Sequence, residues 1–122
     1  MAKLLETRHV LAVPDAEKTA AFFCEKLGFT RIPVGDPGWR FVQRDGHVFM
    51  FGSCPDSLHP TKIGDHSYFA YVVVDAIDAL HAELVQRGAL PKSGPEDKPW
   101  RMREFVVRTP DGHGMTFGQA IK

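Results

Sequence analysis

Hydrophobic and polar positions follow two periods along this chain, and the same succession of periods occurs twice. Each half begins with a run rich in β-branched and aromatic residues. Apolar residues three and four positions apart follow, which is the spacing of one buried helix face. A glycine then ends each helical pattern, and Asp75 is a favourable N-cap for the second helix. The positions that carry these signals are Val13, Ala16, Ala20, Phe23, Leu27 and Gly28, and then Val74, Ile77, Leu80, Leu84 and Gly88.

A second repeat lies in the closing part of each half. The stretch "DGHVFMFG" begins at Asp45 and "DGHGMTFG" begins at Asp111, so both read D-G-H-x-x-x-F-G. Asp-Gly predicts a hairpin turn, because glycine adopts a positive φ without steric cost. Each half therefore predicts the order β-α-β-β-β. His47 and His113 occupy the same position after the turn, and turn geometry explains them better than chemistry does.

These patterns predict an α+β fold made of two βαβββ modules. The modules span residues 4–54 and 66–120, and a linker rich in proline, glycine and polar residues, 55–65, joins them into one domain. The second module has an additional loop at 91–100. A helix covers one face of each small sheet. We expect the other faces to curve around a shared, cup-shaped cavity.

Composition excludes several classes of function. The 122 residues include 15 basic and 15 acidic residues, so no broad field attracts nucleic acid or an anionic membrane. The longest apolar run, Tyr68 to Val74, is far shorter than the roughly 20 residues of a membrane span. No secretory signal is visible in the first residues, and Cys24 and Cys54 suggest neither a metal pair nor a disulfide framework. We expect a cytoplasmic protein without a nucleic-acid or membrane partner.

Three stretches, "VLAVPDAEKTAAFFCEKLGF", "VVVDAIDALHAEL" and "REFVVRTPDGHGMTF", extend the comparison to known families. With the paired modules, they resemble the glyoxalase, bleomycin-resistance and extradiol-dioxygenase superfamily, also called the vicinal oxygen chelate superfamily. The ending "PW…REF…TPDGH…TFG" is similar to its bleomycin-resistance-like branch. The resemblance implies the fold, but the superfamily includes isomerases, dioxygenases, thiol transferases and non-catalytic drug-binding proteins.

The resemblance also implies where a metal would bind. Enzymes of the superfamily hold a divalent ion with His and Glu side chains from the inner strands, and the matching positions here are Arg8, Met50, Phe69 and Thr116. None of these is a suitable ligand for Zn, Ni, Mn or Fe, which need imidazole or carboxylate groups. A register shift of one would bring in His9 but no second ligand. We therefore expect no metal and no other cofactor.

Strand alternation predicts what lines the cavity instead. Trp39 and Phe41 should share a face with Val48 and Met50. Phe105, Val107 and Arg103 should share a face with Thr116, and Trp100 could close the opening. Arg8 either pairs with an acid such as Glu6 or Glu104, or awaits an anionic or carbonyl-bearing ligand. The predicted ligand-binding residues are Arg8, Trp39, Phe41, Met50, Phe69, Tyr71, Trp100, Arg103, Phe105 and Thr116.

The leading interpretation is a metal-independent protein that sequesters a planar or aromatic compound, of the antibiotic-resistance type, in a homodimer cavity. The chain is neutral, whereas relatives that hold cationic glycopeptides are expected to be acidic, so a neutral or anionic compound is an equal expectation. One alternative is a superfamily enzyme, such as a glyoxalase-type lyase or isomerase or a dioxygenase. This alternative includes metal-free acid–base chemistry with Tyr71, Glu104 or His66. A purely structural or regulatory dimer is a third. Whether the modules pair within one chain or across the dimer stays open.

Overall fold

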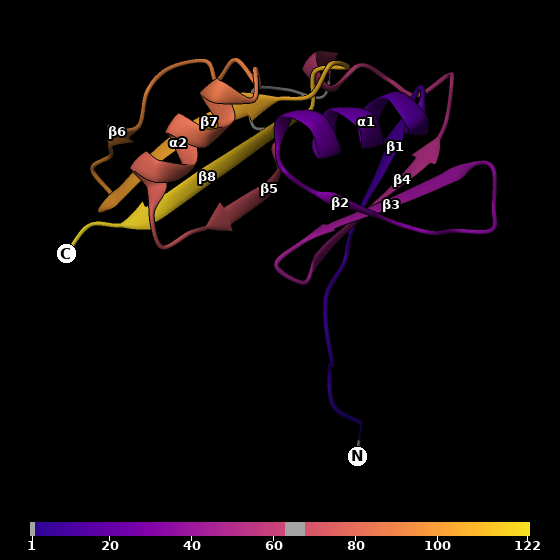
Figure 1. Ribbon diagram of the computed structural model, residues 1–122, viewed down its shortest axis with the longest axis horizontal. Coiled ribbons are helices and arrows are strands. Elements are labelled where there is room, and N and C mark those ends of the chain that lie inside the picture. The colour runs from indigo at the N-terminus through magenta and orange to yellow at the C-terminus, as the bar shows by residue number, and fades with distance from the viewer. Residues whose placement is uncertain (1, 63–67) are drawn as a thin grey trace. The chain divides into compact units, whose positions relative to one another are not determined.

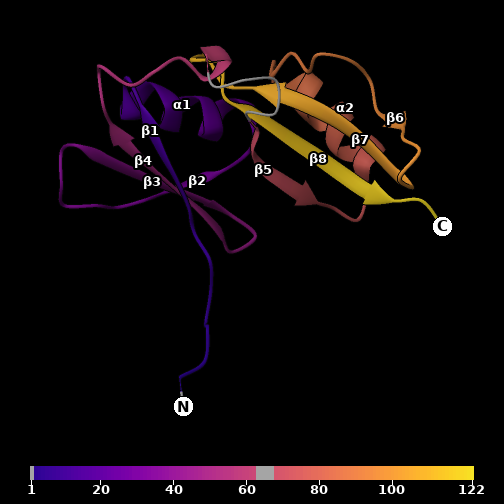
Figure 2. The same cartoon turned by 180° about the vertical axis from the view of Figure 1, so that it is seen from behind.

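The computed structural model describes residues 2–62 and 68–122, shown from two sides in Figures 1 and 2. The chain divides into two compact units, Met1–Ser57 and Leu58–Lys122. They are called the first and the second module below, and each is described by itself.

The first module is a four-stranded sheet with one helix. In chain order its elements are β1 (His9–Val13), α1 (Ala16–Lys26), β2 (Thr30–Ile32), β3 (Trp39–Arg44) and β4 (His47–Ser53). The strands lie in the order β1-β4-β3-β2, with β1 parallel to β4 and the other neighbours antiparallel.

The second module repeats this topology. A single 3₁₀ turn, η1 (Pro60–Lys62), precedes β5 (Tyr68–Val73), α2 (Ile77–Gln86), β6 (Glu96–Asp97), β7 (Met102–Arg108) and β8 (Gly114–Ala120). The strand order is β5-β8-β7-β6, and β5 is parallel to β8. The predicted α+β class with two βαβββ modules is confirmed, while a cavity shared by the two sheets stays a prediction.

Aromatic packing forms the core between α1 and its sheet. The ring of Phe23 lies 5.1 Å from that of Phe29, 5.4 Å from Phe49 and 4.8 Å from Phe51, and its side chain is fully buried. Burying such a side chain contributes roughly 1.5–3 kcal/mol. The predicted helix face is confirmed, because its four members are all buried: Ala16, Ala20, Phe23 and Leu27.

The second core is built in the same way between α2 and its sheet. Ile77 and Leu84 of α2 are fully buried, and the rings of Phe105 and Phe117 lie 5.4 Å apart beneath the helix. His81 of α2 contacts Phe105 edge to face at 5.0 Å. Of the described residues, no helix is long and apolar enough to cross a membrane.

In both modules, the residue that follows the Phe-Gly pair caps the N-terminus of the helix with its side chain. Ser53 and Gln119 follow the two Phe-Gly pairs. Ser53 Oγ accepts a hydrogen bond from the Ala16 amide at 2.9 Å, and Gln119 Oε1 accepts one from the Ile77 amide at 2.9 Å. The expectation that Asp75 caps α2 was wrong, because the N-cap residue is Ala76. Gln119 accepts from the Ile77 amide instead, and its Nε2 atom donates to the Asp75 carbonyl at 2.7 Å.

The two Asp-Gly turns differ in length. In the first module Arg44 pairs with His47, and Asp45 and Gly46 form a two-residue turn with φ of 53° and 82°. In the second module the ladder ends where Arg108 pairs with Gly114, so that residues 109–113 form the loop. Pro110 has no N–H to donate to a ladder, which explains why pairing stops earlier. The register of β7 on β8 is therefore shifted by one residue relative to β3 on β4.

Candidate ligand-binding faces

Each sheet has one face against its helix and one opposite face, called its open face below. In the first module the register places Phe41 beside Met50 and Trp39 beside Gly52, with Val10 on the other side of Met50. Val10 is 60% exposed. The predicted grouping on this face is therefore confirmed. Its members are Val10, Ala12, Ile32, Trp39, Phe41, Gln43, Val48, Met50 and Gly52.

Trp39 lies flat over the backbone of its neighbouring strand. A Cβ on Gly52 would be 3.1 to 3.3 Å from three atoms of the indole ring. Phe41 meets Trp39 edge to face, with ring centroids 6.4 Å apart. The glycine that ends the first octapeptide thus makes room for an aromatic ring on the open face.

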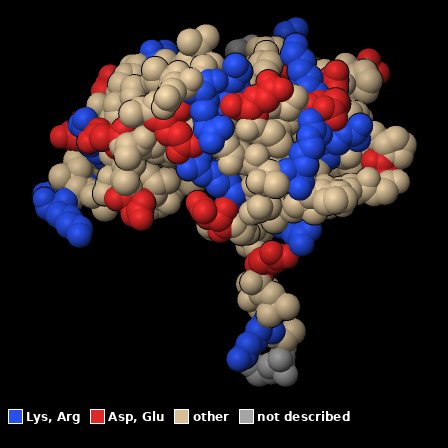
Figure 3. Space-filling model, viewed as in Figure 1, with Lys and Arg blue, Asp and Glu red and all other residues tan. Residues whose placement is uncertain are grey.

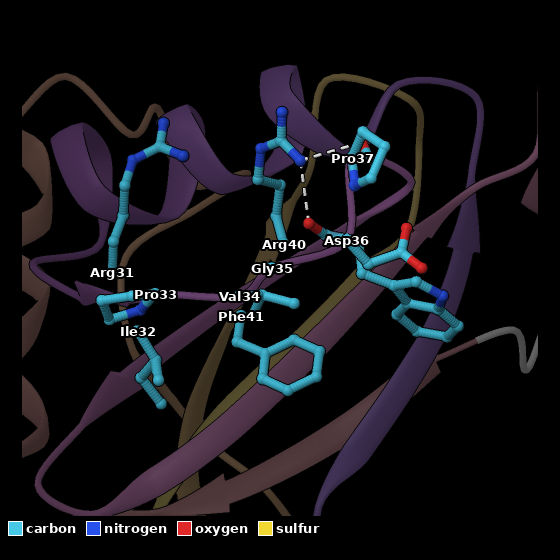
Figure 4. A pocket seen from close by; sticks show the side chains of 10 residues that line it. Arg31, Ile32, Pro33, Val34, Gly35, Asp36, Pro37, Arg40 and Phe41 are labelled. Carbon is cyan, nitrogen blue, oxygen red and sulfur yellow. Dashed lines mark hydrogen bonds between the residues drawn. The ribbon is translucent and has the colours of Figure 1, made fainter.

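A hollow of about 510 Å³ lies beside these rings at the β2–β3 loop (Figure 4). Its volume is within the range of small-molecule sites, about 300–1,000 Å³. Figure 4 shows Arg31 and Arg40 pointing to one side of this segment, and Ile32 and Phe41 to the other. The lining residues are Arg31, Ile32, Pro33, Val34, Gly35, Asp36, Pro37, Trp39, Arg40 and Phe41.

Glu17 of α1 holds the two arginines of this hollow. Arg31 donates to both carboxylate oxygens, at 3.0 and 2.6 Å, and Arg40 Nε donates to Oε1 at 2.9 Å. These bonds, that from Arg31 foremost, lower the pKa of Glu17. Arg40 also donates to the carbonyls of Pro37 and Trp39, at 3.0 and 2.8 Å, and so fixes the loop.

The open face of the second module carries a hydrogen-bonded cluster. Tyr71 Oη donates to Glu104 Oε2 at 2.6 Å, and Trp100 Nε1 donates to the same oxygen at 3.2 Å. Tyr71 crosses Gly118 to reach the carboxylate, because a Cβ on Gly118 would be 2.2 Å from the phenol oxygen. Burial, followed by the hydrogen bond to Glu104, raises the pKa of Tyr71 to about 12.

The predicted face of three β7 residues was wrong. Val106, not Val107, pairs with Thr116, and Phe105 pairs with Phe117, so Phe105 and Val107 are buried against α2. Arg103 also lies on the helix side, where it forms ion pairs at 3.0 Å with Asp78 of α2 and Asp97 of β6. The prediction assumed that both Asp-Gly hairpins have the same length. The longer second loop moves every β7 side chain to the other face.

A bulge in β5 changes the expected role of Phe69. Tyr68 pairs with Gly114 and Ala70 with Met115, so Phe69 is an additional residue, and its ring contacts His113 at 5.9 Å. Tyr68, which is not among the predicted ligand-binding residues, therefore lies on the open face. The members of this face are Tyr68, Tyr71, Val73, Met102, Glu104, Val106, Arg108, Gly114, Thr116 and Gly118.

Arg8 is neither buried nor unpaired. It precedes β1 and forms an ion pair with Glu6 at 2.9 Å, with side chains 43% and 53% exposed. Pairing with Glu6, one of the two expectations for Arg8, is thus observed. The adjacent His9 stacks on Phe49 at 4.9 Å on the helix side of the sheet, which removes it from the open face.

The groups at the superfamily's metal positions do not suit a divalent metal. They offer a paired guanidinium, a thioether, a phenyl ring and a hydroxyl, from Arg8, Met50, Phe69 and Thr116. Among residues 2–62 and 68–122, no three His, Cys, Asp or Glu side chains are grouped as a metal site would require. His66, expected at the mouth of the cavity, lies outside the described residues.

In Figure 3 basic and acidic residues are interspersed on the visible surface.

Comparison with known proteins identifies the family. The model of the Glyoxalase/Bleomycin resistance protein/Dioxygenase superfamily matches residues 7–117, so the chain belongs to this superfamily. Bleomycin resistance proteins of Geobacillus stearothermophilus and Staphylococcus aureus are each 27% identical in an alignment 144 positions long, gaps included, which covers 98% of this chain and 99% of theirs.

Solved structures share the fold over the whole chain. A bleomycin resistance determinant encoded on the transposon Tn5 has a TM-score of 0.76 and 26% identity, covering 96% of this chain and 98% of that one. A glyoxalase-related enzyme from Clostridium phytofermentans has a TM-score of 0.77 at 22% identity, covering 98% of each chain. At that identity the second likeness establishes the fold alone.

Proposed function

We propose that this protein binds and sequesters a planar or aromatic small molecule without a metal ion. The observation that carries the proposal is the pair of aromatic open faces. Trp39 and Phe41 lie on the first, and Tyr71 with Trp100 on the second, where Tyr71 is 47% and Trp100 61% exposed. Relatives named bleomycin resistance proteins, similar over nearly the entire chain, support a sequestering function of this kind.

Ring stacking would supply affinity without any reactive group. Each aromatic pair contributes about 0.5–1.5 kcal/mol beyond the area that it buries. Indole and phenol rings on rigid strands lose little conformational freedom on binding, which favours a flat ligand over a flexible chain. The hollow at the β2–β3 loop adds volume beside Trp39 and Phe41, so it would receive a part of the ligand that extends past the rings.

A homodimer is part of the proposal, because a second copy could cover the exposed aromatic residues of the open faces. The second copy would close the ligand cavity, whether modules pair within one chain or between chains. The proposal keeps the division of the sequence into modules 4–54 and 66–120 with a linker at 55–65. Free thiols at Cys24 and Cys54 accord with a reducing, cytoplasmic setting.

Tyr71 is suited to binding better than to acid–base catalysis. A phenol with a pKa of about 12 stays protonated at neutral pH, so it acts as a hydrogen-bond donor and a stacking surface. This disfavours an enzyme in which Tyr71 removes a proton from its substrate.

The test uses the two tryptophans as reporters, since the chain has only Trp39 and Trp100. The probe is acridine, a planar and neutral ring system, titrated at neutral pH and followed by fluorescence and calorimetry. Trp39→Ala and Trp100→Ala should each weaken binding by about 2- to 13-fold, the equivalent of one lost stacking pair. Val85→Ala, at an exposed position on α2, is the control and should bind like the wild type. Unchanged affinity in both tryptophan variants would contradict the proposal.

A further inference from the structure

The Glu104 carboxylate is the centre of the cluster on the second open face. Its Oε2 atom accepts both hydrogen bonds, from Tyr71 and from Trp100. Within the described part of the chain, its Oε1 atom receives no hydrogen bond from another side chain, and no basic group forms an ion pair with Glu104. Two donors thus fix the orientation of the carboxylate and leave one oxygen available.

The surroundings of Glu104 do not neutralise its charge. Lys98 is a nearby cation, but its ammonium group donates to Glu96 Oε2 at 3.0 Å, and Glu96 is the register partner of Glu104 on β6. These three groups, two carboxylates and one ammonium, together carry a net negative charge. The Tyr71 and Trp100 groups that donate to the carboxylate carry no positive charge.

The same two donors place aromatic rings beside the carboxylate. Tyr71 and Trp100 both expose about half of their surface or more, so a ligand can reach both rings. Aromatic rings attract a cation placed over their faces, and a carboxylate attracts it by charge and by accepting its N–H groups. One chemical group satisfies both requirements, namely a flat ring system with a protonated nitrogen.

We infer that Glu104 is a specificity-determining residue of the proposed site, and that it selects planar cations over neutral or anionic compounds of the same shape. The inference rests on the proposed function and extends it. The charge of the whole chain gives no such preference, because its acidic and basic residues are equal in number. The preference arises locally, from one carboxylate between two rings.

The test compares three probes with one ring system at neutral pH: aminoacridine as the cation, acridine as the neutral form and acridine carboxylate as the anion. The wild type should bind aminoacridine about tenfold or more tightly than acridine, and acridine carboxylate most weakly. Glu104→Gln keeps an acceptor oxygen for Tyr71 and Trp100 but removes the charge. It should lose about tenfold in affinity for aminoacridine and less than about twofold for acridine.

The control variant removes the same charge elsewhere in the second module. Glu83→Gln on α2, where Glu83 pairs with Arg87, should leave the order of the three probes unchanged. Circular dichroism and urea unfolding of each variant separate a change in binding from a change in folding.

Three results would overturn the inference. Equal affinity of the wild type for the three probes would do so, as would an unchanged preference in Glu104→Gln or an equal loss in Glu83→Gln. In each of these cases acridine still binds, and the proposed function stands. If no probe binds to the wild type, the proposed function fails, and the inference fails with it.

Discussion

Replacing Gly118 with alanine would place a methyl group where the Tyr71 side chain lies. The new Cβ would be 2.2 Å from the phenol oxygen, 2.7 Å from Cζ and 3.0 Å from Cε1. Carbon and oxygen atoms pack at about 3.5 Å or more, so Tyr71 would have to move by about 1 Å. The hydrogen bond to Glu104, 2.6 Å long, would then be broken or lengthened.

The pKa of Tyr71 is the most direct measure of this displacement. It is raised from the usual 10.0 to about 12 by burial and by the Glu104 hydrogen bond, and both causes weaken when the ring moves outward. We therefore predict that Tyr71 of Gly118→Ala ionises between these two values, closer to 10. Because the folded-state pKa is raised, the stability contributed by Tyr71 is complete below about pH 10 and is lost as pH rises through about 12.

Absorbance of the tyrosinate ion during an alkaline titration supplies the readout. The chain has two tyrosines, Tyr68 and Tyr71, and Tyr71→Phe identifies which step belongs to which. Gly94→Ala is the matched control, since nothing lies within 4 Å of a Cβ at Gly94.

The free energy of unfolding gives a second readout, in which Gly94→Ala gains stability and Gly118→Ala gains little or none. Alanine in place of an unhindered glycine stabilises by about 0.4–1 kcal/mol, chiefly by restricting the unfolded chain. Loss of the Tyr71 bond to a charged acceptor, discounted for exposure, costs about 1 kcal/mol and offsets that gain. An unchanged Tyr71 step in Gly118→Ala, or a gain in stability equal to that of Gly94→Ala, would refute the reasoning.

Two further predictions concern the first module. Phe23→Ala should lower the free energy of unfolding by about 3–5 kcal/mol, because it removes the ring that contacts Phe29, Phe49 and Phe51. Urea unfolding measures this change, and a loss below about 1 kcal/mol would contradict this packing. Glu17→Gln should cost less than about 1 kcal/mol at neutral pH and low salt, with the difference shrinking as salt is added. The pKa of Glu17 is lowered in the folded state, so the stability that its ion pairs contribute is present above pH 4.5 and is lost as pH falls through the lower folded-state pKa. A difference in unfolding free energy between Glu17→Gln and the wild type that persists in acid would argue against the ion pairs with Arg31 and Arg40.

The repeated strand and helix patterns, together with the repeated octapeptide, were sufficient to predict two βαβββ modules, because hydrophobic period and turn residues act locally. The first open face was also predictable, since a two-residue turn fixes the register between β3 and β4. The second face was not, because its register depends on loop length. A clue was present in the sequence: Pro110 precedes the second Asp-Gly, whereas Arg44 precedes the first. With that shift included, alternation places Glu104 on the open face and Phe105 on the other.

Other features of the candidate site depend on contacts between distant residues. The bulge that exchanges Tyr68 for Phe69 leaves no local signal, since Tyr68, Phe69 and Ala70 all suit a strand. The final glycines of the repeat, Gly52 and Gly118, are a further example. Their role follows from what crosses them, Trp39 over Gly52 and Tyr71 over Gly118, and the crossing side chains come from different strands of the two modules.

Calorimetric titration of the chelator-treated protein with acridine, without and with added Ni²⁺, Zn²⁺ or Mn²⁺, would show whether ligand binding is independent of a metal. The account predicts saturable binding in the presence of chelator, with the same affinity when each metal is added and no heat of binding from the metals alone. Binding of acridine only after a divalent metal has bound would contradict it, and would show that the ligand depends on an ion that Arg8, Met50, Phe69 and Thr116 are not suited to hold.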